Sequence, residues 1–230
     1  MALLGHVARL VLHTDDQAEC LRVLDEAGYE DGGTSTYGHR VSDGQLLMLV
    51  CADETSAPGL LYAAASLQSV ADRLTAAGVS YTGNRHTELN MEGPGLLRIR
   101  VVSASADDME DRSGLDNPVL GFLDSIVVPV ADAAEAAAWA QRCGFFILET
   151  SDVGSPMVDV TDGLVKLSFR VQQPGAPYLH YTADVDSEWG SHMTSTLGAS
   201  CRVIERGQQI ELARINVADA LQIMVTPDEF

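Results

Sequence analysis

The chain has 230 residues, of which 46% are hydrophobic and 20% charged, a balance typical of globular proteins and unlike that of disordered chains. It carries 33 acidic and 14 basic residues, a formal net charge of −19. This charge argues against nucleic-acid binding and against docking on an anionic membrane, because both need a basic surface. It favours solubility, and it would also attract a cationic small-molecule ligand.

The four cysteines are scattered along the chain without a CxxC pair or any other metal-ligand spacing, at Cys20, Cys51, Cys143 and Cys201. Such a pattern predicts buried free thiols in a reducing compartment. The N-terminal segment lacks a basic region followed by a long apolar core, and no run of about 18 apolar residues is present. We therefore expect a cytoplasmic protein that does not span a membrane.

The first half of the chain predicts two strand–helix–strand groups in succession. Apolar and β-branched runs indicate strands at 7–13, 34–41, 45–51, 60–65, 79–83, 86–91 and 96–103. Apolar residues at helical spacing predict one helix that begins after Asp15 or Asp16 and ends at Gly28, and a second over 67–77. Ser42-Asp43-Gly44 predicts a hairpin turn, and residues 53–58 a loop.

The second half follows the same plan after a polar, acidic segment at 105–118, which has no apolar pattern and is interpreted as a linker. Strands are expected at 122–130, 146–149, 157–160, 164–171, 178–185, 201–205, 211–217 and 221–226, and helices at 133–142 and 187–197.

Two short patterns occur once in each half. Asp16-x-Ala18-Glu19 returns as Asp132-x-Ala134-Glu135, 116 residues later, and Val41-Ser42-Asp43-Gly44 returns as Val160-Thr161-Asp162-Gly163, 119 residues later. These spacings indicate a duplication. They predict a first domain over 1–104, a linker over 105–118 and a second domain over 119–230.

The repeated order of elements resembles the vicinal oxygen chelate superfamily, which includes glyoxalase I, extradiol dioxygenases and bleomycin-binding proteins. The strongest segments are residues 123–132 (LDSIVVPVAD) and 74–79 (LTAAGV). The resemblance implies an α+β fold of two tandem domains, each made of paired βαβββ modules that form a cupped, mostly antiparallel mixed sheet with helices on the outer face. It also implies pairing of modules between chains, hence a homodimer.

In metal-dependent members of that superfamily, one ligand comes from a first strand, one from the strand that opens the second module and one from a last strand. In the second half these positions fall on Ser125, on His180, and on Gln222 or Met224. In the first half they fall on Ala8 or Arg9, on Gly59 or Leu60, and on Arg98 or Arg100. We therefore expect no metal cofactor. The alternative is a divalent Fe, Mn, Ni or Zn ion with His180 as one ligand.

Strand alternation predicts which side chains share a face with His180. The resemblance would place them around one concavity as ligand-binding residues: Ser125, Lys166, Ser168, Arg170, His180, Thr182, Gln222 and Met224. The alternative is a solvated or interdomain surface. His180 itself is a candidate base, a metal ligand or a hydrogen-bonded structural histidine. In the first half, Arg98 and Arg100 share a face and would hold an anion or form ion pairs with acidic residues.

The preferred hypothesis is a protein that binds a small molecule without a metal, in the manner of the drug-binding members of the superfamily. The first alternative is a metal-dependent lyase or dioxygenase with its site around His180. The second is a structural or interaction protein whose cups are filled by its own side chains.

Overall fold

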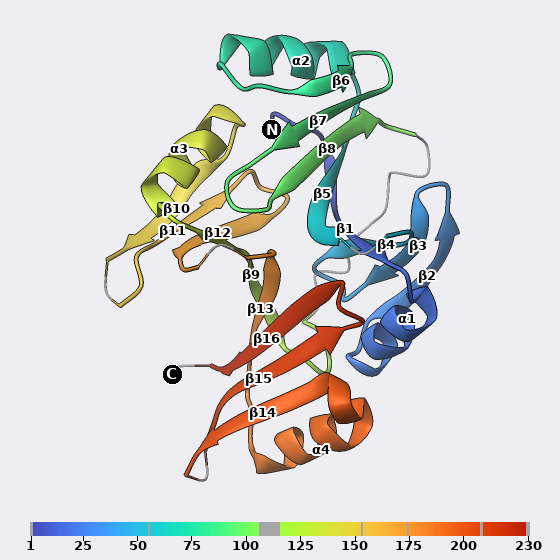
Figure 1. The fold of residues 1–230 in the computed structure, drawn as a ribbon, viewed down its shortest axis with the longest axis vertical. Helices are drawn as coiled ribbons and strands as arrows, with labels where there is room; N and C mark the ends of the chain where they lie inside the picture. The colour runs from blue at the N-terminus through green and yellow to red at the C-terminus, as the bar shows by residue number, and fades with distance from the viewer. Residues whose placement is uncertain are drawn as a thin grey trace. The chain divides into compact units, whose positions relative to one another are not determined.

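The computed structural model describes residues 2–54, 56–105, 116–152, 154–173, 175–207 and 209–228. They form four modules of one order, strand, helix and three strands (Figure 1). Module 1 consists of β1 (Val7–Thr14), α1 (Gln17–Glu26), β2 (Glu30–Ser35), β3 (Gly38–Ser42) and β4 (Leu47–Ala52). Module 2 consists of β5 (Ser56–Ala64), α2 (Leu67–Ala76), β6 (Thr82–Asn84), β7 (Glu88–Glu92) and β8 (Arg98–Ser103).

The second half repeats this order. Module 3 consists of β9 (Phe122–Val130), α3 (Ala133–Arg142), β10 (Phe146–Ser151), β11 (Met157–Thr161) and β12 (Lys166–Val171). Module 4 consists of β13 (Tyr178–Ala183), α4 (Ser187–Leu197) with a 3₁₀ turn at Gly198–Ser200, β14 (Cys201–Arg206), β15 (Gln209–Val217) and β16 (Leu221–Pro227).

Each half of the chain contributes one eight-stranded mixed sheet. The strand orders are β2-β3-β4-β1-β5-β8-β7-β6 and β10-β11-β12-β9-β13-β16-β15-β14. The long connection through a helix makes β9 parallel to β12 and β13 parallel to β16, whereas the hairpin neighbours are antiparallel. Neither sheet closes on itself, and the α+β fold of paired βαβββ modules is confirmed.

Backbone contacts group the modules differently from the two halves. One compact unit contains Met1–Leu10, Pro58–Asp111 and Ile126–Pro177, mainly modules 2 and 3. The other contains Val11–Ala57, Arg112–Ser125 and Tyr178–Phe230, mainly modules 1 and 4. The domain boundaries expected from the repeat stay a prediction. Most of the expected linker lies outside the described residues, but Asn117 is buried and donates from Nδ2 to the Ala27 carbonyl.

Each helix begins at a residue that caps its first turn. The side chains of Asp16, Ser66, Asp132 and Asp186 each accept a hydrogen bond from the backbone N–H three residues further on. Three helices pack an apolar stripe on their own module: α2 on β7 and β8, α3 on β10, β11 and β12, and α4 on β14 and β15. Helix α1 contacts β4 of its own module and also β15 and α4 of module 4. All four predicted helices are present, with ends within one or two residues of the prediction.

Register confirms the predicted alternation on the strands. Leu167 and Phe169 of β12 pair with Ile126 and Val128 of β9, and all four are buried on the side of α3. Lys166, Ser168 and Arg170 lie on the opposite side. We call this side, in every module, the helix-free face. All four cysteines are free and three are buried, and burial raises the pKa of Cys20 and Cys143 to about 12.

Two local predictions were wrong. Residues 34–41 do not form one strand, because β2 ends at Ser35 and a tight hairpin turns at Thr36-Tyr37. Gly38 permits this turn with a φ of +144°, and the Ser35 hydroxyl donates to its carbonyl. Residues 53–58 are not all loop either, since β5 already begins at Ser56. Within the described part of the chain, no helix has the length and hydrophobicity needed to span a membrane.

Candidate functional site

His180, on β13 of the second unit, lies between a carboxylate and a hydroxyl. Its Nδ1 is 3.0 Å from Oδ2 of Asp124, near the start of β9, and its Nε2 is 3.0 Å from Oγ1 of Thr226 on β16. The side chains of His180 and Asp124 are mostly shielded from solvent, with exposed fractions of 13% and 27%. The three residues form a hydrogen-bonded line on the helix-free face of module 4.

The Asp124 carboxylate determines which nitrogen of the His180 ring donates a hydrogen bond. An ionised Asp124 accepts the Nδ1–H of the imidazole, so the neutral ring presents an unprotonated Nε2 to the Thr226 hydroxyl. The Ser125 hydroxyl donates a second hydrogen bond, 2.9 Å long, to the same Asp124 oxygen. A carboxylate that accepts the Nδ1–H in this way fixes the tautomer and the orientation of the ring, and leaves Nε2 as the nitrogen that can accept a hydrogen bond or a proton.

Three other residues expected around the cup also lie on this face of module 4. Met224 pairs with His180, and Thr182 pairs with Thr226 across the parallel β13–β16 ladder. Gln222 is two residues before Met224 and donates from Nε2 to Asn216 at 3.3 Å. The face therefore surrounds His180 with half-buried hydroxyl, amide and thioether groups.

The remaining residues expected from the second half lie in the first unit, on the helix-free face of module 3. Lys166 forms an ion pair of 2.8 Å with Asp159, which is 3% exposed. Arg170 donates from Nε to the buried Ser168 hydroxyl at 3.2 Å. Register places Ser168 directly opposite Asp159. These side chains form a local polar network in which one cation already neutralises the buried carboxylate.

Arg98 and Arg100 share the helix-free face of module 2, as their spacing predicts. Arg100 forms an ion pair of 2.5 Å with Glu88 of the neighbouring strand, while Arg98 lies opposite Glu92 and Gly59. Both arginines are exposed. The ion-pair alternative therefore describes Arg100 better than the anion-binding one.

The described neighbours of His180 do not make up the metal-ligand set that the resemblance implies. Among the described residues, no group of three or more His, Cys, Asp and Glu side chains is placed to hold a metal ion. Asp124 and His180 supply two good donors, but the third neighbour is the neutral Thr226 hydroxyl, which bonds to Nε2. A divalent ion of the iron type prefers two imidazoles and a carboxylate. The donor set does not fit, and no step through a metal follows from it.

Buried hydroxyls connect modules 1 and 4 inside the second unit. Tyr29 and Tyr181 are hydrogen-bonded through their hydroxyls at 2.6 Å, and the Tyr181 hydroxyl donates to Asp43 Oδ2. The other oxygen of Asp43 accepts the N–H groups of Gln45 and Leu46. Burial raises the pKa of both tyrosines well above the usual range. This cluster is closed to solvent and stabilises the unit.

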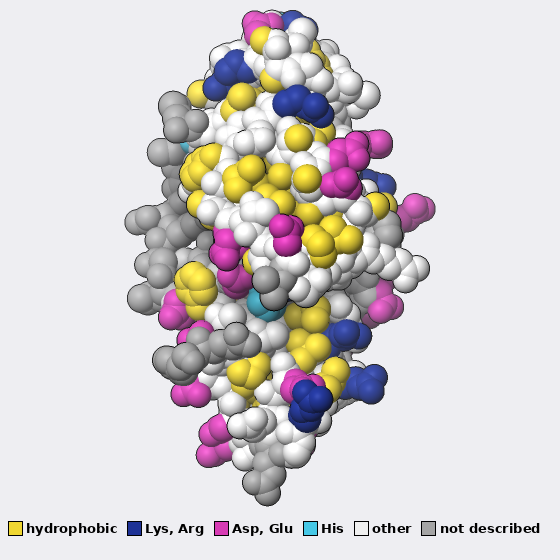
Figure 2. Space-filling model, turned by 90° about the vertical axis from the view of Figure 1, so that its left-hand side faces the viewer, with side chains coloured by type: hydrophobic (Ala, Val, Ile, Leu, Met, Phe, Trp, Pro, Cys, Tyr) yellow, Lys and Arg dark blue, Asp and Glu magenta, His cyan; other side chains and the backbone are white. Residues whose placement is uncertain are grey.

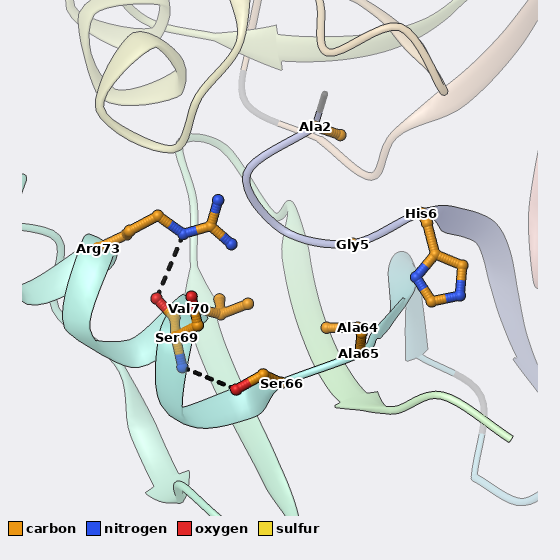
Figure 3. Close-up of a pocket in the computed structure, with 9 residues that line it drawn as sticks. All are labelled: Ala2, Gly5, His6, Ala64, Ala65, Ser66, Ser69, Val70 and Arg73. Carbon is orange, nitrogen blue, oxygen red and sulfur yellow. Dashed lines mark hydrogen bonds between the residues drawn. The ribbon is translucent and has the colours of Figure 1, made fainter.

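A cavity of about 290 Å³ opens in the first unit at the start of α2 (Figure 3). The guanidinium of Arg73 extends over it toward the loop of Ala2 and Gly5, while its Nε donates to the Ser69 carbonyl. The Ser66 hydroxyl is occupied as the helix cap. The cavity contains none of the predicted site residues, and its lining is Ala2, Gly5, His6, Ala64, Ala65, Ser66, Ser69, Val70 and Arg73.

An apolar surface marks the edge of the module 3 sheet. Phe146, Ile147 and Leu148 are consecutive on edge strand β10 and are 54%, 44% and 52% exposed. Figure 2, which looks from the side that carries α3 and β10, shows hydrophobic side chains gathered in this region.

Sequence reasoning missed Asp124 and Thr226, the two direct partners of His180. Asp124 had a signal, since it is the one charged residue in the apolar strand 122–130 and aspartate is rare in strands. Thr226 has the same parity as Gln222 and Met224 and lies within the predicted strand 221–226, so the same alternation would have included it.

Comparison with solved structures finds proteins with a similar fold. Homoprotocatechuate 2,3-dioxygenase from Brevibacterium fuscum matches all of this chain and 72% of its own, with a TM-score of 0.63 and 12% identity. The 2,3-dioxygenase LapB from Pseudomonas sp. KL28 matches all of this chain and 93% of its own, with a TM-score of 0.60 and 11% identity. For 2,2',3-trihydroxybiphenyl 1,2-dioxygenase from Sphingomonas wittichii, the shares are 98% and 91%, the TM-score 0.58 and the identity 13%.

No family model and no curated protein sequence matches the chain. At identities of 11–13% the structural similarity concerns the fold and not the reaction. The similar structures are extradiol dioxygenases, which belong to the superfamily that the sequence resembles. The chain therefore has the fold of the vicinal oxygen chelate superfamily, with four βαβββ modules.

Proposed function

We propose that the protein binds a small organic molecule on the helix-free face of module 4 and exchanges a proton with it through His180. The observation that carries this proposal is the imidazole held between Asp124 and Thr226 at 3.0 Å on each side. A base needs a fixed tautomer, an oriented ring and an accessible nitrogen, and the Asp124 contact supports the first two. The third requirement is met when a ligand displaces the Thr226 hydroxyl from Nε2. The proton of the ligand's hydroxyl or acidic C–H then passes to that nitrogen.

This proposal needs no metal, and its first test is a thermal-shift screen of phenols, amines and small carboxylic acids. A compound at 100 times its Kd stabilises the folded protein by about 2.7 kcal/mol, which is a rise of about 5–10 °C in Tm for a chain of this size. We expect at least one such compound, whose effect is lost in His180→Gln. His192→Gln is the matched control, because His192 is an exposed histidine on α4. Equal stabilisation of His180→Gln would contradict the proposal.

A metal-dependent dioxygenase is the second candidate. It is favoured by the structural neighbours, and by the place of Asp124 on β9 and His180 on β13, the strands that carry the first two implied ligand positions. The discriminating measurement is the metal content of protein produced with iron and manganese in the medium. Stoichiometric metal that disappears in both Asp124→Ala and His180→Ala would replace the metal-free proposal.

A further inference from the structure

Four strands of module 4 each place one side chain in a straight row across the helix-free face. His180 of β13 pairs with Met224 of β16, Met224 pairs with Arg214 of β15, and Arg214 pairs with Arg202 of β14. Paired residues in neighbouring strands point to the same face. Gly190 of α4 packs against Val203 and Ile210, so the helix covers the other face. Strands lie about 4.8 Å apart, which puts the backbones of His180 and Arg214 on the order of 10 Å from one another.

The two arginines of this row have no acidic partner among the described residues. Arg202 and Arg214 are directly opposite, an arrangement that is destabilising for like charges. Nε of Arg214 is shielded from solvent and has no hydrogen-bond acceptor in the described part of the chain. Carboxylates are abundant in a chain with 33 acidic residues, and Arg206 on the same strand does pair with Glu211 at 3.2 Å. Within the part of the chain that the structure describes, no ion pair compensates the positive charge at Arg202 and Arg214.

We propose that Arg202 and Arg214 form an anion subsite for the carboxylate or phosphate group of a small molecule whose other end reaches His180. This inference rests on the proposed function and names the class of its ligand. Two guanidinium groups side by side supply the parallel donors that an oxyanion accepts. Met224 lies between the charged end and the imidazole and contacts the apolar middle of the ligand. The net charge of the chain favours a cationic ligand, but the local charge of this row is positive.

The experiment measures the binding of benzoate and of inorganic phosphate to the full-length protein by calorimetry, at constant ionic strength. Benzoate supplies a carboxylate and inorganic phosphate a phosphate group, so the comparison of their affinities tells which of the two groups the subsite binds better. We expect at least one to bind, and its affinity to fall about tenfold or more in Arg214→Gln and in Arg202→Gln, since each loses a charged hydrogen bond. Arg206 lies on β14 with Arg202. Arg206→Gln is therefore the matched control, and its affinity for both probes should be unchanged. The inference is overturned if neither probe binds, or if both bind the two variants as they bind the natural protein.

A second measurement separates a ligand-binding role from a structural one. Without ligand, Arg214→Gln is expected to unfold at the same temperature as the natural protein or higher, because the substitution relieves the repulsion between the arginines. A marked fall in Tm together with unchanged benzoate and phosphate binding in Arg202→Gln would assign Arg214 to the scaffold and overturn the inference.

His180→Gln keeps the failure of this inference distinct from that of the proposed function. The variant should bind the simple anions within about twofold of the natural protein, because they do not extend to His180. If the arginine variants lose anion binding while every larger ligand binds His180→Gln normally, the anion subsite stands and the proton-exchange function fails. If the arginine variants bind the simple anions as the natural protein does, while larger ligands still require His180, the proton-exchange function stands and the anion subsite fails.

Discussion

At the scale of single residues, the hydroxyl cluster of the second unit separates two similar-looking tyrosines. Tyr29 gives one hydrogen bond to Tyr181, whereas Tyr181 bonds both Tyr29 and Asp43. Tyr29→Phe is therefore expected to cost about 1 kcal/mol of the free energy of unfolding, the net value of one hydrogen bond. A phenylalanine at position 29 should fit, because Phe145 occupies the corresponding position of the second half and is buried there.

Tyr181→Phe removes the donor of a buried carboxylate as well. We expect a loss of about 2–4 kcal/mol, because Asp43 Oδ2 and the Tyr29 hydroxyl both lose their partner in a shielded place. Urea unfolding of the two variants beside the natural protein measures the difference. Equal costs would mean that the Asp43 contact contributes nothing.

The same tyrosines give the protein an alkaline limit. Burial raises the pKa of Tyr29 and Tyr181 in the folded state well above the unfolded value of about 10. The stabilisation that this shift represents is fully present below about pH 10 and is lost as the pH rises toward the folded pKa. Absorbance at 295 nm should show that at least two of the six tyrosines, Tyr29 and Tyr181 among them, ionise only when the protein unfolds. In Tyr29→Phe the number of late tyrosines should fall by one, and early ionisation of all six in the natural protein would contradict the assignment.

The candidate site was predictable from the sequence only in part, and the reason is physical. Parity along one strand is local, so it correctly grouped His180 with Thr182 on β13 and Gln222 with Met224 on β16. Contacts between strands depend on register, which a sequence does not state. Asp124 reaches His180 and Arg214 aligns with Met224 through such register. These two residues, absent from the sequence prediction, now carry the proposals.

At the scale of elements, the stability of the four helices depends on the capping residue that precedes each of them. Asp132 accepts the N–H of Glu135 at 2.9 Å, and its replacement by alanine should cost about 1 kcal/mol, whereas Asp132→Asn should cost a few tenths. Asp152→Ala is the control, because Asp152 is an exposed acid with no hydrogen bond to the described residues. Thermal unfolding measures all three. A similar loss for Asp152→Ala would show an effect of charge and not of capping.

Local signals explain why elements were predicted well. Helix caps and the glycines that follow the helices, such as Gly28 and Gly144 with φ of +86° and +95°, act within a few residues and are visible in the sequence. The hairpin at Thr36-Tyr37 was missed because its first turn residues are neither Asn nor Asp, so the usual two-residue signal is absent. Errors of this kind move a strand end without changing the fold.

At the scale of the whole molecule, the duplication led to a boundary that the contacts cross. A repeat shows that two halves share a plan, but not which modules pack together, since each module presents similar apolar faces. In the second unit, Tyr29 and Asp43 from the first half bond Tyr181 from the second. In the first unit, a side chain at Gly95 would collide with the Pro129 carbonyl at 2.6 Å, so the two halves approach closely there as well.

These contacts predict that neither half is self-sufficient. Made as two separate chains, residues 1–110 and 111–230, the halves should copurify in equal amounts when expressed together. Each half alone should lack a cooperative unfolding transition. The first half would expose Tyr29 and Asp43, and the second half Tyr181, without their hydrogen-bond partners. Tyr181→Phe in the second chain should weaken the association, while Asp152→Ala on the same chain should not. Two independently folded halves with sharp transitions of their own would instead support the boundary at 105–118, and would make the contacts between modules 1 and 4 secondary to folding.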